Sequence, residues 1–453
     1  MKRHIYPLVA MAALATASAY AQSTSSPNVA YDAISGTEYI TDDPVAINNY
    51  LVMKDTEIIH MNPDSAQEMK DAVKRLQAIF YDDQFRNSQD PKSPYFMLLS
   101  RNGKLAMGVG GDVRVIGSYD FDGSQEGSGF APYNIPIPKD ISSNSLFQIS
   151  PNRTGVFFTI LGHNDRFGDF QVYVHGKFNG ANNTFKLDKA YATIGDWLFG
   201  LAPTTFSDPI AQPATVETDG PNSEVDDKRV LLRYMHKLSQ KFTIAASIEN
   251  ADNDVPTSAS YRPHTSTIPD VAAFLQFASG KQHIRVTGIV RNMRYTDLVS
   301  MTNHNVTGWG ATFNVKLSPV NPLTIYGSFN AGRGIGSMVN DLSLGDNDLL
   351  GYTDDPGKMY APASFGWYGA LEYYFSHKVF STLIFSQERM LLKKDTAYSG
   401  DGYRYGLYGT ANVFWNIVPR LQVGAEFNIG KRCDQNGAHR LGYRTSIMAQ
   451  YSF

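Results

Sequence analysis

The sequence predicts an all-β fold: a 16-stranded antiparallel transmembrane β-barrel preceded by a short N-terminal α-helical extension in the periplasm. Three observations support this prediction. Apolar and polar residues alternate with period two from Lys104 onward. The connections between these segments are alternately short turns and long polar loops. The chain also ends on an aromatic residue, Phe453, at the end of its clearest alternating segment.

The composition agrees with a barrel that has one face in lipid and the other in water. A chain of 453 residues would ordinarily suggest two or three domains. Here 12% of residues are aromatic, 38 are Gly, only 18% are charged, and the mean hydropathy is -0.28. Cys433 is the only cysteine, which excludes an intrachain disulfide and a Cys-based zinc site. The net charge of -3 and the pI near 6.4 exclude a broadly basic nucleic-acid binder.

Residues 1–21 have the pattern of a secretory signal peptide. Lys2, Arg3 and His4 precede a short apolar stretch, and a small-x-small site at 19–21 predicts that the mature chain begins at Gln22. No later stretch of 18 residues is continuously apolar. We therefore expect an exported protein that can span a membrane only as a barrel.

The segment 22–100 is expected to be a periplasmic extension, with residues 22–62 mostly irregular and one helix at about 64–86. Ser65 and Glu68 form a capping-box pattern at its start. Apolar residues then follow at steps of four, three and four: Met69, Val73, Leu76 and Phe80. This seam has two interpretations, a helix packed on its own chain or a short coiled coil that sets an oligomer. Pro91 and Pro94 end the helical region.

The barrel is expected over residues 101–453. In the last strand, Leu441, Ile447 and Tyr451 fall on one face, and Arg440, Arg444 and Gln450 fall on the other. A terminal aromatic residue on such a strand resembles the C-terminal strand of Gram-negative outer-membrane proteins, where it is the signal for the barrel-assembly machinery. A soluble sandwich or propeller does not explain this ending.

Fifteen connections join sixteen strands and leave both barrel ends in the periplasm. A barrel of this size is wide enough for an aqueous channel. Seven connections are short (163–169, 195–197, 238–241, 278–282, 318–322, 375–378 and 416–420), and eight are long (120–147, 179–184, 205–228, 251–270, 296–306, 332–364, 391–402 and 433–439).

The face that avoids lipid carries an excess of positive charge. A charge on the lipid face costs about 2–4 kcal/mol near the midplane, so the charged residues of the strands should face the lumen. Acids predicted to face inward are Asp112, Glu249, Glu372 and Glu426. Cations predicted to face inward are Arg114, Arg153, Lys177, Arg229, Arg233, Arg285, Arg291, Lys316, Arg404, Arg432, Arg440 and Arg444. The alternation is ambiguous at 185–194 and around 380–389.

Fixed positive charge inside a narrow pore attracts anions and repels cations. We expect the pore-lining residues that contact solute to be Arg114, Arg153, Arg229, Arg233, Arg285, Arg291 and Arg444. Any single one of them can instead be a wall residue paired with a nearby acid. The 205–228 loop has no clear periodicity. If it folds into the barrel as a constriction loop, Asp208, Glu217 and Asp219 oppose the basic wall; the alternative is a loop packed on the outer surface.

Several segments resemble the DcaP-like porins, a family of outer-membrane diffusion channels for dicarboxylates and related anions. The matching segments are GKLAMGVGGDVRV (103–115), NRTGVFF (152–158), AYATIGDWLFGLAPTTFSDP (190–209), TVETDGPNSEVDDKRVLLRY (215–234) and FTIAASIEN (242–250). The resemblance covers about residues 60–453, and the 190–250 block is its specific part. It implies a homotrimer, a helical N-terminal extension and basic constriction residues on the wall. The helix here is short and the 332–364 loop has no counterpart, so the choice of substrate is not carried over.

The sequence therefore predicts an outer-membrane porin that passively conducts small hydrophilic solutes and prefers anions such as dicarboxylates. Its expected partners are membrane lipid, small anionic solutes and two further copies of itself. No serine-hydrolase, P-loop or paired-Cys motif stands in the mature chain, so we expect no enzyme, no cofactor and no metal. One alternative is a barrel whose long loops bind a surface partner, with conduction incidental. The other is a closed structural or assembly barrel.

Overall fold

The computed structural model describes residues 104–139, 144–178 and 184–453, and parts of the chain before them. Those earlier parts are residues 74, 76, 78–81, 86, 89–94 and 96–100, together with three strands given as backbone: β1 (Val29–Asp32), β2 (Thr37–Ile40) and β3 (Glu57–His60). The predicted signal peptide lies outside the described residues. The region expected to be mostly irregular thus contains three short strands.

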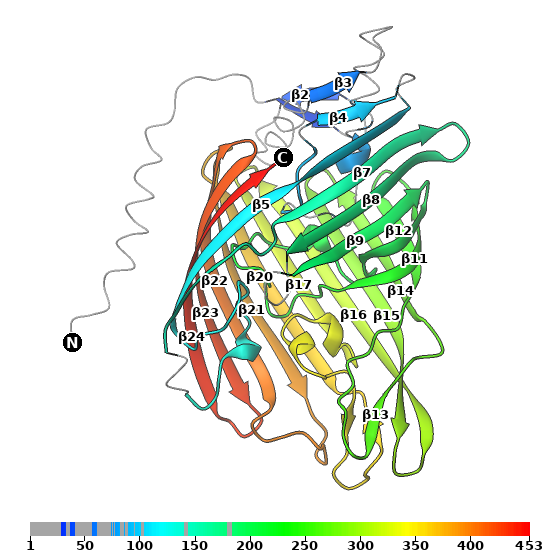
Figure 1. The fold of residues 1–453 in the computed structure, drawn as a ribbon, viewed down its shortest axis with the longest axis vertical. Helices are drawn as coiled ribbons and strands as arrows, with labels where there is room; N and C mark the ends of the chain where they lie inside the picture. The colour runs from blue at the N-terminus through cyan, green and yellow to red at the C-terminus, as the bar shows by residue number, and fades with distance from the viewer. Residues whose placement is uncertain are drawn as a thin grey trace, which may run out of the picture.

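Sixteen strands form a closed barrel in which neighbouring strands run antiparallel, which confirms the predicted fold class (Figure 1). The barrel closes where the last strand pairs with the first. The strands are β5 (Leu105–Asp122), β7 (Gly155–Asn164), β8 (Gly168–Phe178), β9 (Phe185–Ile194), β10 (Trp197–Pro203), β11 (Lys228–Lys237), β12 (Phe242–Glu249), β14 (Asp270–Ser279), β15 (Gln282–Asp297), β16 (Thr302–Val320), β17 (Leu323–Arg333), β20 (Ala363–Tyr374), β21 (Val379–Leu391), β22 (Tyr403–Val418), β23 (Leu421–Asp434) and β24 (His439–Ser452).

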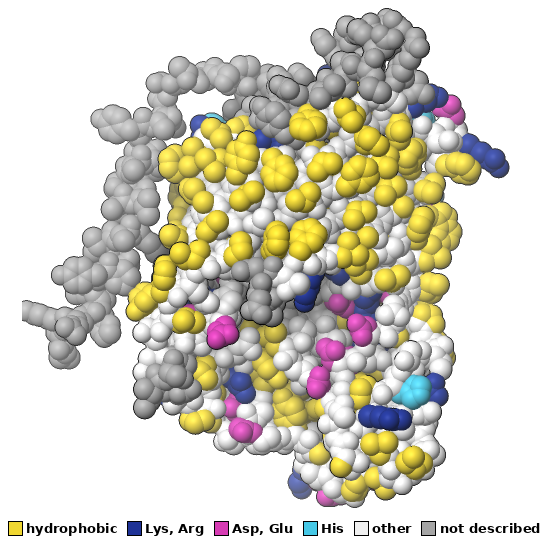
Figure 2. Space-filling model, in the orientation of Figure 1, with side chains coloured by type: hydrophobic (Ala, Val, Ile, Leu, Met, Phe, Trp, Pro, Cys, Tyr) yellow, Lys and Arg dark blue, Asp and Glu magenta, His cyan; other side chains and the backbone are white. Residues whose placement is uncertain are grey.

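The outer surface of the barrel is apolar because side chains alternate strictly across each strand. In β24, Leu441, Ile447 and Tyr451 are exposed, whereas Arg440 and Arg444 are buried toward the lumen. All four tryptophans of the chain are exposed on the outer face: Trp197, Trp309, Trp367 and Trp415. Figure 2 shows apolar side chains over a broad band of this face, with polar and charged side chains below it. This is the surface that a bilayer requires.

The seam between β24 and β5 is uneven. Ser452 pairs with Asp112, and Phe453 exchanges two backbone hydrogen bonds with Gly111 (2.9 and 3.0 Å). The edge of β5 before Gly111 therefore extends past the end of β24. A short strand, β4 (Phe96–Leu99), pairs with that edge, and β3 pairs with β4. The N-terminal extension is thus joined to the barrel at the end where the C-terminus lies (Figure 1).

The short turns lie where the sequence predicts them, but two of the long loops are wrong in length. The connection expected at 296–306 is only residues 298–301, because β15 and β16 continue as a long hairpin. The connection expected at 433–439 is only residues 435–438. The other connections carry short elements: β6 (Leu146–Ser150), β13 (Tyr261–His264), β18 (Leu350–Gly351), β19 (Met359–Tyr360), and the 3-10 turns η2 (Pro132–Asn134), η5 (Pro209–Ala211), η6 (Gly336–Met338) and η7 (Leu342–Leu344).

The predicted N-terminal helix is present in part and packs inside the barrel. Lys74, Leu76 and residues 78–81 are helical, and Arg86 lies beyond the helix. Residues 64–73 lie outside the described part of the chain. Leu76 and Phe80, two members of the predicted apolar seam, are buried against inward-facing residues of the barrel, including Phe157. Of the two interpretations of the seam, the described residues favour a helix packed on its own chain.

Candidate functional site

The connection between β10 and β11, residues 204–227, lies inside the barrel and is held there by inward-facing side chains. Both oxygens of Glu426 on β23 accept backbone N–H groups of the loop, from Val216 (2.7 Å) and Glu217 (2.9 Å). Asn412 on β22 donates to the Ala214 carbonyl. Because these anchors come from the far wall, the loop crosses the lumen.

The three loop acids singled out in the sequence take different positions. Asp208 is buried against β15, 2.7 Å from His283 Nε2 and 3.2 Å from an Arg285 nitrogen. Glu217 is buried and accepts hydrogen bonds from the Tyr408 hydroxyl and from the backbone of the loop itself. These two carboxylates hold the loop in place. Asp219, in contrast, lines an open cavity.

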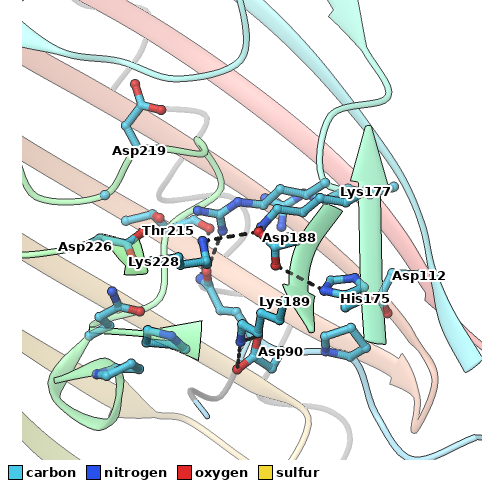
Figure 3. Close-up of a pocket in the computed structure, with 18 of the residues that line it drawn as sticks. Asp90, Asp112, His175, Lys177, Asp188, Lys189, Thr215, Asp219, Asp226 and Lys228 are labelled. Carbon is cyan, nitrogen blue, oxygen red and sulfur yellow. Dashed lines mark hydrogen bonds and ion pairs between the residues drawn. The ribbon is translucent and has the colours of Figure 1, made fainter. Parts of the chain in front are cut away.

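That cavity lies between the loop and the wall formed by β5, β8, β9 and the start of β11. It encloses about 820 Å³ of space free of protein atoms, including the solvent at its mouths. On the wall side it is lined by the cations Arg114, Arg153, Lys177, Lys189 and Lys228, and on the loop side by the acids Asp219, Glu224 and Asp226. Figure 3 shows Asp219 and Asp226 on the side opposite Lys177. The arrangement produces an electric field across the lumen, directed from the basic wall to the acidic loop.

A buried carboxylate organises the basic wall. Asp188 on β9 lies 2.8 Å from Lys177, 3.2 Å from Lys228 and 3.1 Å from His175 (Figure 3). It reduces the net positive charge of the wall and fixes the positions of the two lysine side chains. This group was missed in the sequence because the register of β8 and β9 shifts between His175 and Gly176. The shift is a β-bulge, and it directs Asp188 and Lys189 to the same inner side.

Arg153 reaches the cavity from a break in the wall. Residues 151–154 separate β6 from β7, and Arg153 has a left-handed backbone with φ of 68°. This conformation is uncommon for a residue with a side chain and is tolerated where the surroundings enforce it. Here Thr154 exchanges two hydrogen bonds with the backbone of Arg114. Arg153 and Arg114 donate to the loop carbonyls of Thr218 and Val216, so the basic wall and the loop are in direct contact at one end of the cavity.

The other five predicted pore-lining arginines are inward-facing and buried, and none of them lines this cavity. Arg291 on β15 lies between Asp270 (3.2 Å) and Asp348 (2.9 Å). Arg444 on β24 pairs with Asp120 (2.7 Å) and donates to three carbonyls of the 123–145 connection. The remaining three bind similar partners: Arg229 with Asp227 and Asp270, Arg233 with Thr205 and Pro203, and Arg285 with Asp208 and Gln276. All five fasten loops to the wall.

A second, wider cavity opens among the short turns at one end of the barrel. It encloses about 2110 Å³ free of protein atoms and touches the constriction loop only at Ile210. Four lysines line it, and three of them lie in or next to the turns: Lys237, Lys241, Lys281 and Lys316. The basic character of the lumen therefore continues into this vestibule.

Neither a metal centre nor a membrane-spanning helix is found in the described part of the chain. No three His, Cys, Asp or Glu side chains among those residues are grouped so that they could hold a metal ion. No helix among them is long and apolar enough to cross a membrane.

Comparisons with known proteins agree with this architecture. A family model described as DcaP outer membrane protein matches residues 99–453. The crystal structure of the outer membrane channel DcaP of Acinetobacter baumannii is similar, with a TM-score of 0.66 at 17% identity over 78% of this chain and 99% of that chain. An anion-selective porin from Comamonas acidovorans is similar with a TM-score of 0.54 at 7% identity, over 77% of this chain and 100% of that chain. The outer-membrane expressed OmpT of Vibrio cholerae has a TM-score of 0.50 at 10% identity, over 79% of this chain and 100% of that chain. No curated protein matches the sequence.

Proposed function

The chain belongs to the DcaP outer membrane protein family, and from this premise we propose that it is a porin that passively conducts small hydrophilic solutes and prefers anions such as dicarboxylates. It is an outer-membrane β-barrel of a Gram-negative cell. The observation that carries the proposal is the cavity between the basic wall and the constriction loop. Arginine and lysine side chains there face the polar space between the wall and the loop. Both side chains bind carboxylates well, and Arg can do so through two parallel hydrogen bonds.

Electrostatics favour an anion over a cation on this path. The acids that fasten the loop, Asp208, Glu426 and Glu217, are buried in ion pairs or hydrogen bonds away from the cavity. Burial and the neighbouring Asp226 and Glu217 raise the pKa of Glu224 well above its usual value, which favours its neutral form. The pKa of Asp219 is also raised, chiefly by burial. On the barrel wall of the cavity, five cations stand against two acids, Asp112 and Asp188, and this excess of positive charge favours an anion.

The reversal potential of the purified protein in a planar bilayer under a KCl gradient tests the proposal. We expect a sign that corresponds to chloride permeating faster than potassium. We also propose a homotrimer, as the family resemblance implies, so current steps should appear in groups of three. A cation-selective current would contradict the assignment of the basic wall as the selective element. An absence of current would favour a closed structural barrel.

The anion selectivity should decrease as the pH rises through the raised pKa of Glu224. Glu224 is protonated below its raised pKa, and it adds a negative charge to the cavity once the pH exceeds that value. Burial and the nearby Arg86 lower the pKa of Lys92 to about 8, so this lysine, which lines the smaller cavity next to the first, loses its charge as the pH rises through about 8. We expect E224Q to flatten most of the pH dependence of the reversal potential and to leave a smaller residual change near the pKa of Lys92. An unaltered pH profile in E224Q would show that Glu224 does not titrate in the pore.

A further inference from the structure

Two consecutive residues of the N-terminal extension occupy the basic side of the cavity. The Asp90 carboxylate lies against the Lys189 ammonium, with both of its oxygens close (3.1 and 3.3 Å). The Gln89 side chain accepts a hydrogen bond from Arg153 (3.0 Å) and donates one to the Thr215 carbonyl of the constriction loop (3.0 Å). The extension thus contacts two wall cations and the loop at once, and Figure 3 shows Asp90 beside Lys189 at the edge of the cavity.

The same extension packs against an apolar patch on the inner wall, called the apolar seat below. Leu76 and Phe80 are buried against Phe157, Tyr173 and other inward-facing apolar residues of the barrel. The Phe80 ring lies 5.6 Å from the Phe157 ring, measured between centroids, and Arg86 lies 4.2 Å above the Phe80 ring. The interior of a conducting barrel is normally polar. An apolar inner wall costs about 25 cal/mol for each Å² left in water, so this wall is suited to a segment that covers it.

Polar contacts hold the part of the extension that follows Phe80 in the sequence. The Ser93 backbone N–H donates to the Tyr81 hydroxyl (2.9 Å), and Arg420 donates to the Ser93 carbonyl (3.0 Å). Arg420 lies in the β22–β23 turn, on another part of the barrel rim from the wall that Phe80 contacts. The described residues between Leu76 and Ser93 are therefore attached at three places: the apolar wall, the basic cavity and this turn.

We propose that these residues, Leu76, 78–81, Arg86 and 89–93, form an internal plug, and that Asp90 is a tethered carboxylate that competes with anionic solutes for the wall cations. The proposal rests on the proposed function, since it identifies the group that an anion must displace. A solute carboxylate that binds Arg153 and Lys189 takes the positions of the Gln89 amide and the Asp90 carboxylate. Entry of an anion and release of the plug are then coupled, and the resting channel is obstructed by its own N-terminal extension.

Thiol labelling tests the plug without relying on conduction. Gln450 on the inner face of β24 lines the cavity and a smaller one beside the plug. In a C433S background, Q450C should react slowly with a small sulfonate-bearing thiol reagent. Adding L76A and F80A removes the apolar seat, and labelling should become at least about fivefold faster, a change equivalent to about 1 kcal/mol in accessibility. Equal labelling rates would overturn the plug. Faster labelling without any current in either protein would support the plug and contradict the proposed function.

Substitution at Asp90 tests the competition itself and leaves the apolar seat intact. The probe is succinate, measured by its block of chloride current through the full-length protein. D90N removes the competing charge, and the succinate concentration for half-block should fall about threefold to tenfold, the value of one charge at a few ångströms in a partly aqueous site. The matched control is D165N in the exposed β7–β8 turn, where Asp165 pairs with Lys104. A half-block concentration that is the same in wild type, D90N and D165N would overturn the role of Asp90.

Discussion

Replacing Asp188 with asparagine is expected to increase the preference for anions about threefold to tenfold. Asp188 lies within 3.2 Å of Lys177 and Lys228, and it cancels part of their charge at the cavity wall. D188N has nearly the same shape and removes one negative charge from the wall beside both lysines. A unit charge a few ångströms from a permeating ion changes the energies of an anion and a cation in opposite directions, which doubles its effect on their ratio.

The measurement is the reversal potential of D188N against wild type in the same salt gradient. K228Q is the opposing variant and should shift the potential toward cations. D196N is the matched control, because Asp196 is an exposed acid in the β9–β10 turn that pairs with His236. A D188N channel with wild-type selectivity would mean that permeating ions do not pass Lys177 and Lys228. A shift in D196N as large as that in D188N would point to a general surface-charge effect.

Removing Arg291 is expected to destabilise the barrel and its loops by about 3–5 kcal/mol. Its guanidinium is fully buried between Asp270 and Asp348 and also donates to the carbonyls of Gly334 and Asp252. R291A leaves two carboxylates without the cation that balances them. Burying an unpaired charge costs more than the ion pair contributes, so the loops that contain Asp252 and Asp348 should separate from the wall.

The loss should be visible as a lower temperature or urea concentration for unfolding of the β-sheet signal in detergent, with noisier open-channel current. R262A serves as the control, because Arg262 is exposed on β13. R291M keeps much of the side-chain volume and should be destabilised nearly as much as R291A, since both lack the charge. Wild-type stability in R291A would show that solvent or another cation compensates Asp270 and Asp348.

The sequence was sufficient for the barrel because lipid imposes a pattern that is readable without tertiary information. The outward positions must be apolar, so the apolar neighbours of Arg444 and Arg114 indicate that these two side chains face the lumen. The structure agrees for both. The alternation became hard to read where the inner face is also apolar. In β21, Phe380 and Ile384 face inward because the loops that fill the lumen give them apolar contacts. Such contacts depend on residues that are distant in the sequence.

The candidate site was harder to predict for the same reason. An inward arginine can be recognised from its strand, but the partner of Arg291 is Asp348, 57 positions away on a loop whose path the sequence does not reveal. Arg114, Arg153 and Asp219 were identified and lie on the cavity. Asp188 was missed because a single bulge reverses the facing of the residues after it. Asp90 was missed because nothing in a polar extension marks it as a lumen residue.

The uneven seam between β24 and β5 has a consequence for the exposed strand edge of the barrel. Pairing of Phe453 with Gly111 closes the barrel, but the first residues of β5, Leu105 to Gly110, extend past β24 and do not pair with it. Among the described residues, β4 and Ser100 pair with this edge, and both belong to the extension that also carries Gln89 and Asp90. An exposed strand edge invites pairing with other chains. The extension therefore covers a strand edge in addition to obstructing the lumen. We expect a protein that lacks its N-terminal region to have an open lumen and to associate with other chains through the exposed edge of β5.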